Sequence, residues 1–209
     1  MQIDVPGLIG AVTRRVEDRE RDGKPVRAVI ASRAYDTDVD DLWDAVTNPE
    51  RIPRWFLPVT GELRLGGRYQ LQGNAGGTIT ECEPPRRFAV TWEFGGGMSW
   101  VTVTLAPEGA GAARLTLEHM APVDPHWETY GAGAVGVGWE LGLMGLDRHL
   151  ASGAAADPAA AAAWSASEEG EAFIRGSAAG WGDAEAASGE DPAKARARAE
   201  TTAKFYTGG

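Results

Sequence analysis

Apolar and polar residues alternate along the middle of the chain, between about residues 62 and 120. Successive side chains of a β-strand point to opposite faces, so this period of two predicts strands with one apolar and one wet face. Phe88, Val90, Trp92 and Phe94 share the apolar face of one such strand. Glycine-containing turns without crossover helices join the strands, which predicts an antiparallel sheet. The expected strands are 26–35, 62–65, 68–72, 78–83, 88–94, 100–106 and 113–120.

Other segments repeat their apolar residues with a helical period. These segments are 8–21, 39–46 and 124–150, and 50–56 is predicted to form a second short helical piece after 39–46. We expect 124–150 to be one long helix that covers the apolar face of the sheet. Its six glycines are unfavourable in a helix interior and need a reason, which is either close approach to the sheet or room for a bound molecule.

The composition changes after Gly153 to mainly alanine, glycine, glutamate and serine. Asp157-Pro158 and Asp191-Pro192 each offer an N-cap followed by proline at the first helical position. Large aromatic side chains in this tail predict that its helices dock on the domain, with the side of the 8–21 helix as one place for them, rather than form a free linker. We therefore predict three regions, which are an N-terminal helical extension (1–25), a main domain (26–152) and an Ala-rich helical C-terminal extension docked on that domain (153–209).

Charge and cysteine content narrow the function classes. The formal net charge is −10, and no Lys/Arg run supplies the basic face that nucleic-acid phosphates or an anionic membrane surface require. The single cysteine, Cys82, forms no internal disulfide and has no neighbour at metal-ligand spacing. No stretch reaches the roughly 18 apolar residues of a membrane span. We expect a cytoplasmic protein with no nucleic-acid partner, no membrane partner, no metal and no cofactor.

The order of the motifs carries a resemblance. DLWDAVTNPERIPRWF, LRLGGRYQL, GTITECEPPRRFAVTWEF, RLTLEH and GWELGLMGLDRHL follow one another over residues 26–152. This series resembles the family similar to the activator of the heat-shock protein 90 ATPase, in the START-like (SRPBCC) superfamily. The resemblance implies an α+β helix-grip fold, in which a curved antiparallel sheet grips a long C-terminal helix. It also implies a deep groove between them, which relatives use for lipids, sterols, polyketides or aromatic molecules and sometimes for catalysis.

The chain has more large aromatic residues than packing of a small domain needs, and aromatic walls with a few polar groups are typical of ligand pockets. His119 continues the inward row of Leu115 and Leu117, so its imidazole is expected to hydrogen-bond a ligand or act as a base. For each aromatic residue, core packing is the alternative, and for His119 it is a hydrogen bond to Tyr69 or to the backbone. The predicted ligand-binding residues are Trp55, Phe56, Tyr69, Trp92, Phe94, His119, Trp139 and Leu143.

Three functions follow from these observations. The first is binding of a hydrophobic small molecule, lipid-like, polyketide or aromatic, in a cavity between sheet and helix. The second is an interaction module with a chaperone or regulator protein as partner. The third is a cyclase, dehydratase or hydrolase with His119 as base and Tyr69 as orienting donor. The third ranks last, because no nucleophile, metal-ligand or phosphate-binding motif is present.

Overall fold

The computed structural model describes residues 4–208. Its helices are α1 (Val5–Gly10), α2 (Val39–Thr47), the 3₁₀ helix η1 (Ile52–Arg54), α3 (Pro125–Tyr130), α4 (Gly133–Ser152), α5 (Pro158–Ser165), α6 (Glu168–Ala187) and α7 (Pro192–Thr207). Its strands are β1 (Thr13–Arg21), β2 (Lys24–Tyr35), β3 (Val59–Gly61), β4 (Arg68–Leu71), β5 (Gly76–Glu83), β6 (Arg87–Phe94), β7 (Gly97–Pro107) and β8 (Ala113–Pro122).

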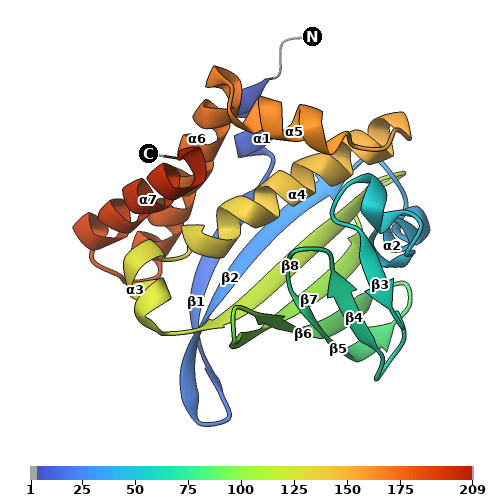
Figure 1. Cartoon of the computed structure of the whole chain (residues 1–209), viewed down its shortest axis with the longest axis horizontal. Coiled ribbons are helices and arrows are strands. Elements are labelled where there is room, and N and C mark those ends of the chain that lie inside the picture. Colours follow the sequence, from blue (N-terminus) through green and yellow to red (C-terminus); the bar gives the residue numbers. More distant parts are fainter. Residues whose placement is uncertain (1–3, 209) are drawn as a thin grey trace. The chain divides into compact units, whose positions relative to one another are not determined.

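The strands form one sheet in the order β1-β2-β8-β7-β6-β5-β4-β3, and Figure 1 shows its long, bent strands. Each pairing from β3 to β8 is antiparallel, as the short turns predict. In register, Val90 lies opposite Val101, and Val101 lies opposite His119. Directly opposed residues share a face, so the predicted apolar row continues across three strands. The α+β fold class is confirmed.

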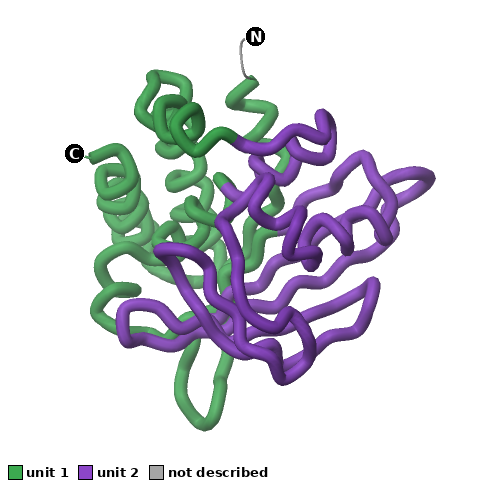
Figure 2. Tube along the Cα trace, turned by 45° about the vertical axis from the view of Figure 1, so that its right-hand side comes forward, with its two compact units in different colours: residues 1–31, 121–141, 157–209 green, residues 32–120, 142–156 purple. Residues whose placement is uncertain are grey.

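The chain divides into two compact units, coloured in Figure 2. Unit 2 consists of residues 32–120 and 142–156. In this unit the second half of α4 is tied to the end of β2: the Tyr35 hydroxyl donates to the Leu143 carbonyl at 3.2 Å, and Arg33 pairs with Asp147 at 2.7 Å. The helix is therefore held beside the strand by one buried hydrogen bond and one ion pair.

Unit 1 consists of residues 1–31, 121–141 and 157–209. Within it α6 packs against α1, β1, α5 and α7. Arg14 on β1 donates to both carboxylate oxygens of Glu140 on α4, at 2.7 and 2.6 Å. The Glu140 side chain is completely buried, so this ion pair connects the strand to the first half of α4 inside the unit.

The predicted helix at 8–21 is wrong. The N-terminal helix α1 ends at Gly10, and residues 13–21 form β1, so the helical extension over 1–25 is corrected to a short helix and an edge strand. Val12 and Val16 are both buried, and their spacing of four fits one face of a strand as well as one face of a helix. The hydrophobic pattern therefore did not distinguish the two structures.

Two further boundaries differ from the prediction. Residues 62–65 are not a strand: the strand is β3, just before them, and a turn follows in which the Gly67 amide donates to the Arg64 carbonyl at 2.8 Å. The expected helix 124–150 is two helices, because Gly131 adopts a φ of 59° that ends α3. Glycine takes this left-handed conformation without the strain that a side chain brings.

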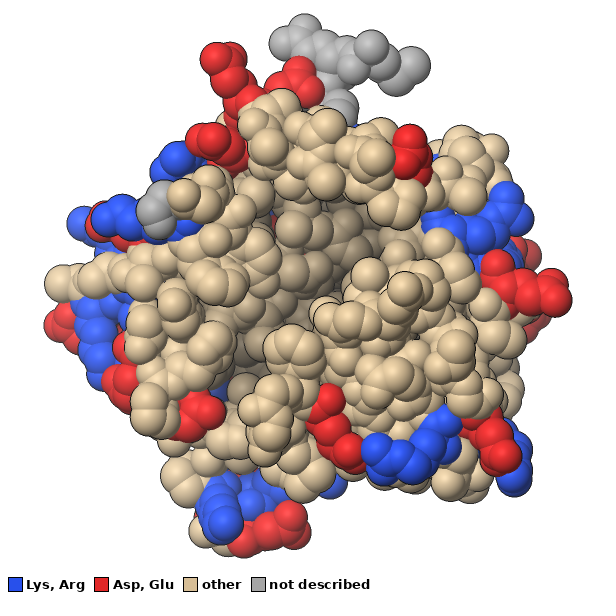
Figure 3. Space-filling view, in the orientation of Figure 1, with Lys and Arg blue, Asp and Glu red and all other residues tan. Residues whose placement is uncertain are grey.

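Charged side chains of both signs lie next to one another near the edge of the face seen in Figure 3. Arg68 and Glu93 pair at 2.8 Å, and Arg87 and Glu81 pair at 2.7 Å. In these pairs each arginine lies beside a glutamate, whereas nucleic-acid binding needs positive charges clustered together.

Candidate functional site

The centre of the candidate site is a hydrogen bond between His119 and Ser99 on the apolar face of the sheet in unit 2. His119 Nε2 lies 2.8 Å from Ser99 Oγ, and the His119 ring meets the Trp92 ring edge-on at a centroid distance of 5.9 Å. His119 is only 3% exposed. The pair places two hydrogen-bonding groups among apolar neighbours.

Strand register explains how these three residues meet. Ser99 pairs with Trp92 across the β6–β7 hairpin, and Val101 pairs with His119 across β7 and β8. Ser99 and Val101 are two residues apart on one strand, so their side chains lie on the same face. The serine therefore lies between the tryptophan on one neighbouring strand and the histidine on the other.

His119 is neutral at pH 7. Burial away from water disfavours the imidazolium ion and lowers the pKa of His119 to about 4. Ser99 has one hydroxyl proton and is placed to donate it either to His119 or to the Trp92 carbonyl at 3.3 Å. In the first case His119 accepts at Nε2, and in the second it donates from Nε2.

Tyr69 lies in the same row of the sheet but has another partner. Its hydroxyl donates to the Thr91 carbonyl at 2.8 Å, and burial raises its pKa above the ordinary value. Tyr69 pairs with Gly77, where a Cβ would overlap the Thr91 backbone. The missing side chain lets the tyrosine ring reach across β5. His119 is therefore hydrogen-bonded to Ser99, while the Tyr69 hydroxyl is hydrogen-bonded to the Thr91 carbonyl.

Trp55 and Phe56 form a second aromatic group in unit 2, just after η1. Their rings stack with centroids 5.4 Å apart, and the Trp55 indole donates to the Ala45 carbonyl at 2.9 Å. A Cβ on Gly142 would lie 3.3 Å from the Phe56 ring, and one on Gly145 would lie 2.5 Å from the Trp55 carbonyl. The aromatic pair is thus packed directly on α4.

The remaining predicted residues lie in three different environments. Leu143 is buried in unit 2, Trp139 is half-buried in unit 1, and Phe94 is 60% exposed at the end of β6. The structure therefore brings Trp92 and His119 together and leaves Phe94 at the surface. That these side chains contact a ligand stays a prediction.

The glycines of α4 lie where other parts of the chain come close to the helix. Close approach was one of the two explanations that the sequence offered for them. Their neighbours are other helices and aromatic side chains rather than sheet. A Cβ on Gly136 would overlap the Trp181 indole of α6, and one on Gly133 would lie 3.0 Å from Thr202 of α7. This packing requires glycine at Gly136 and Gly145 in particular.

The sequence analysis missed Ser99, because it expected the strand to begin at Trp100, whereas β7 begins at Gly97. The signal was present in the hairpin turn. Gly95 and Gly96 both have positive φ, so the tight turn sets Trp92 opposite Ser99 and aims the serine at the apolar face. A strand extended back to the turn would have placed a hydroxyl beside His119.

Among residues 4–208, no three His, Cys, Asp or Glu side chains gather closely enough to hold a metal ion. Within the same residues no helix is both long and apolar enough to cross a bilayer. His119 and Ser99 present neutral hydrogen-bonding groups at the site, and Trp92 presents an aromatic ring.

Comparison with known proteins gives the family. Residues 36–151 match the model of the family described as "Activator of Hsp90 ATPase homolog 1-like protein". The chain belongs to this family. The match confirms the resemblance seen in the motifs. It leaves α1, β1, β2, α5, α6 and α7 outside the matched range.

Solved structures of similar proteins support the assignment. CalU16 from Micromonospora echinospora is 35% identical, with a TM-score of 0.69 over 83% of this chain and 98% of CalU16. DynU16, described as a protein in the dynemicin biosynthetic locus, is 27% identical, with a TM-score of 0.54 over 61% of this chain and 48% of DynU16. MLL2253 from Mesorhizobium loti shares the fold at 24% identity and a TM-score of 0.53. Among curated proteins, no sequence matches significantly.

Proposed function

We propose that this family member binds a hydrophobic small molecule, lipid-like, polyketide or aromatic, on the apolar face of the sheet in unit 2. The observation that carries the proposal is the part-buried hydrogen bond between the buried His119 and Ser99, beside Trp92. Burying polar groups in apolar surroundings is unfavourable unless they are hydrogen-bonded, and a purely apolar core would avoid this cost. Recognition of a ligand by hydrogen bonds to His119 and Ser99 would explain why polar residues occupy this apolar face.

The chemistry of the pair favours an uncharged polar group on the ligand. His119 is neutral at pH 7 because its pKa is lowered to about 4, and the serine hydroxyl is neutral as well. A hydroxyl or carbonyl group can bond such a pair in either of its proton arrangements. The Trp92 ring then offers an apolar wall against which an aromatic or aliphatic body packs.

Binding is favoured over catalysis by the same geometry. A general base works best with a pKa near the operating pH, and His119 lies well below that range. The Tyr69 hydroxyl, which was expected to orient a substrate, donates to the Thr91 carbonyl instead. The geometry therefore does not support the catalytic hypothesis, in which His119 is the base and Tyr69 orients the substrate.

The comparisons add support of a different kind. DynU16 is described as belonging to a biosynthetic locus, and a protein encoded with biosynthetic enzymes has small molecules at hand to bind. For the present chain we extend this to the ligand class predicted from its sequence.

Native mass spectrometry of the chain purified from its own host tests the proposal. We expect a species heavier than the protein by the mass of one small molecule, and loss of that species on denaturation. The Trp92→Leu variant should lose the bound mass, whereas Trp100→Leu should retain it, since Trp100 pairs with Thr91 and Met120 on the opposite face. Protein that is ligand-free from its host and binds no member of a hydrophobic compound panel would refute the proposal.

A chaperone-cofactor role is the second candidate, and the description of the matched family favours it. The experiment is the ATPase rate of a heat-shock protein 90 from the same host, with and without an equimolar amount of this chain. Stimulation that persists in Trp92→Leu would support the chaperone role and count against the small-molecule role. An unchanged rate is the result that small-molecule binding predicts.

A further inference from the structure

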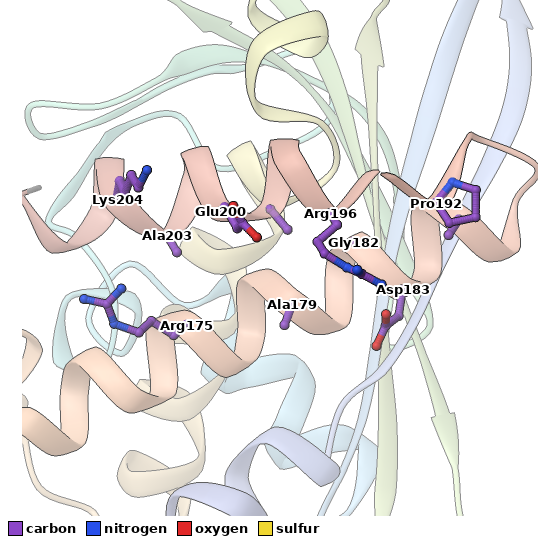
Figure 4. A pocket seen from close by; sticks show the side chains of 11 residues that line it. Arg175, Ala179, Gly182, Asp183, Pro192, Arg196, Glu200, Ala203 and Lys204 are labelled. Atoms are coloured by element: carbon purple, nitrogen blue, oxygen red, sulfur yellow. The ribbon is translucent and has the colours of Figure 1, made fainter. Parts of the chain in front are cut away.

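A groove of about 480 Å³ runs between α6 and α7 in unit 1, and Figure 4 shows it from close by. Its floor consists of small side chains, among them Ala179, Gly182, Ala199 and Ala203. A Cβ on Gly182 would lie 2.9 Å from the Ala199 Cβ, so the two helices touch along this line. The small floor leaves space above it for larger side chains from outside.

The groove has the length and shape of a short helix. It reaches from Arg175 to Ala186 along α6, which at 1.5 Å per residue is about 16 Å, or three helical turns. On both helices the lining residues recur at intervals of three and four, so they form a straight row along each helix. A third helix can lie along such a row with its side chains between those of the other two.

The rims of the groove carry charges at regular spacing. On α7, Arg196, Glu200 and Lys204 are four residues apart, which gives the order plus, minus, plus. On α6, Arg175, Ala179 and Asp183 give plus, neutral, minus. Figure 4 shows Arg175 and Lys204 at one end of the groove and Asp183 beside Arg196 further along. Arg175 also pairs with Glu171 at 3.1 Å, an exposed pair of the kind that contributes little.

We propose that this groove binds an amphipathic helix of a partner protein. The partner helix carries large apolar residues along the face that enters the groove. It carries acidic residues opposite Arg196 and Lys204 and a basic residue opposite Glu200. This arrangement is the helix-in-groove mode of recognition, in which apolar anchors give affinity and flanking charges give specificity.

The two rims have different roles in this arrangement. The charge order on α7 reads the same from either end, so it does not distinguish the two directions of a bound helix. The order on α6 does distinguish them, because Arg175 and Asp183 require an acid and a base at opposite ends. The α6 rim therefore sets the direction of the partner.

A helix fits the rims better than an alkyl chain with an anionic head. Such a lipid would satisfy Arg175 and Lys204 but would place its apolar chain between the carboxylates of Asp183 and Glu200. A helix offers charges of both signs at the required intervals. The surface belongs to α6 and α7, outside residues 36–151, so the proposal is independent of the ligand proposed for unit 2.

The probes are two synthetic peptides of about 18 residues, roughly five helical turns. Both peptides carry the same row of leucines on one face. On the flank that faces α7, the first peptide has an acidic, a basic and an acidic residue at four-residue spacing. The second peptide has a basic, an acidic and a basic residue at the same positions. Fluorescence anisotropy with the full-length chain should show at least about tenfold tighter binding of the first peptide, a difference that falls as salt is raised.

Two sets of variants make the test specific. Ala179→Arg fills the groove and should abolish binding, whereas Ala172→Arg, also at an exposed alanine of α6 but outside the groove, should leave binding unchanged. The triple variant Arg196→Glu, Glu200→Lys, Lys204→Glu inverts the α7 rim and should prefer the second peptide. This gain of binding cannot arise from misfolding.

Equal binding of the two peptides, or binding that survives Ala179→Arg, would overturn the proposal. Self-association of the wild-type chain in sedimentation, abolished by Ala179→Arg, would also overturn it, because the occupant would then be a second copy. Retention of peptide binding in Trp92→Leu is expected, and its loss would show that the peptide binds elsewhere.

Discussion

At the scale of single residues, His119 makes stability depend on pH. Its pKa is lowered from 6.5 to about 4 in the folded protein, so the unfolded chain binds more protons between these values. Stability from the neutral histidine is therefore complete above about pH 6.5 and is lost as pH falls toward 4. We expect the free energy of unfolding to fall by about 3 kcal/mol from this group between pH 7 and pH 4.

Urea denaturation at a series of pH values measures this effect. His119→Gln should remove the histidine component of the pH dependence, whereas His126→Gln, at an exposed position, should retain it. An identical pH profile for His119→Gln and the wild type would show that the buried histidine is not the group that titrates.

Glu140 gives a second prediction at this scale. Its completely buried carboxylate accepts two hydrogen bonds from Arg14. Glu140→Gln removes the carboxylate charge and leaves the Arg14 guanidinium without a counter-charge. The free energy of unfolding should fall by about 3–5 kcal/mol. Glu171→Gln breaks the exposed pair with Arg175 and should cost about 0.5 kcal/mol or less. If chemical denaturation showed the same loss of unfolding free energy for Glu140→Gln and Glu171→Gln, burial would not be what makes the Arg14–Glu140 pair important.

At the scale of elements, α4 depends on glycines that its helix propensity disfavours. Gly136→Ala should gain about 1 kcal/mol of propensity, yet the new methyl group overlaps the Trp181 indole. Overpacking of this kind typically costs about 1–3 kcal/mol, so we expect net destabilisation. Gly10→Ala in α1, where a Cβ meets nothing within 4 Å, should be neutral or slightly stabilising.

Thermal unfolding of the two glycine variants measures the difference. A Gly136→Ala protein as stable as the wild type would mean that α4 and α6 separate at little cost. Restoration of stability by combining Gly136→Ala with a smaller residue at Trp181 would instead identify the indole as the cause.

Helix starts were the elements best predicted from local sequence. Asp157 accepts from the Ala159 amide at 2.9 Å, and Asp191 accepts from the Ala193 and Lys194 amides at 3.0 and 2.9 Å. Both caps were expected from an aspartate followed by proline. The N-cap of α6 is Ser167, whose hydroxyl accepts from the Gly170 amide at 3.2 Å.

At the scale of the whole molecule, the chain passes repeatedly between its two units. Residues 157–209 complete unit 1, and α6 and α7 cover β1, α1 and α3 within it. Residues 26–152, the predicted main domain, include neither β1 nor α6 and α7. Phe173 and Trp181 are almost completely buried, and each contributes about 2–3 kcal/mol by leaving water.

Truncation after Ala156 tests this dependence. We expect the shortened chain to aggregate in size-exclusion chromatography and to bind a dye for exposed apolar surface, since the partners of Val12 and Val16 have gone. A monodisperse truncated protein with the melting temperature of the full chain would show that residues 1–156 fold without α5, α6 and α7.

The sequence alone determined the antiparallel strands, the helix caps and the family. These features depend on alternation, on single capping residues and on short turns, which act within a few residues. Only the tertiary structure decided between helix and strand at residues 13–21, because the spacing of four between Val12 and Val16 fits both. It also decided which residues meet across long sequence distances, as Ser99 meets His119 and Gly136 meets Trp181. Such contacts depend on strand register and on packing against elements far away in the chain, and no local pattern contains that information.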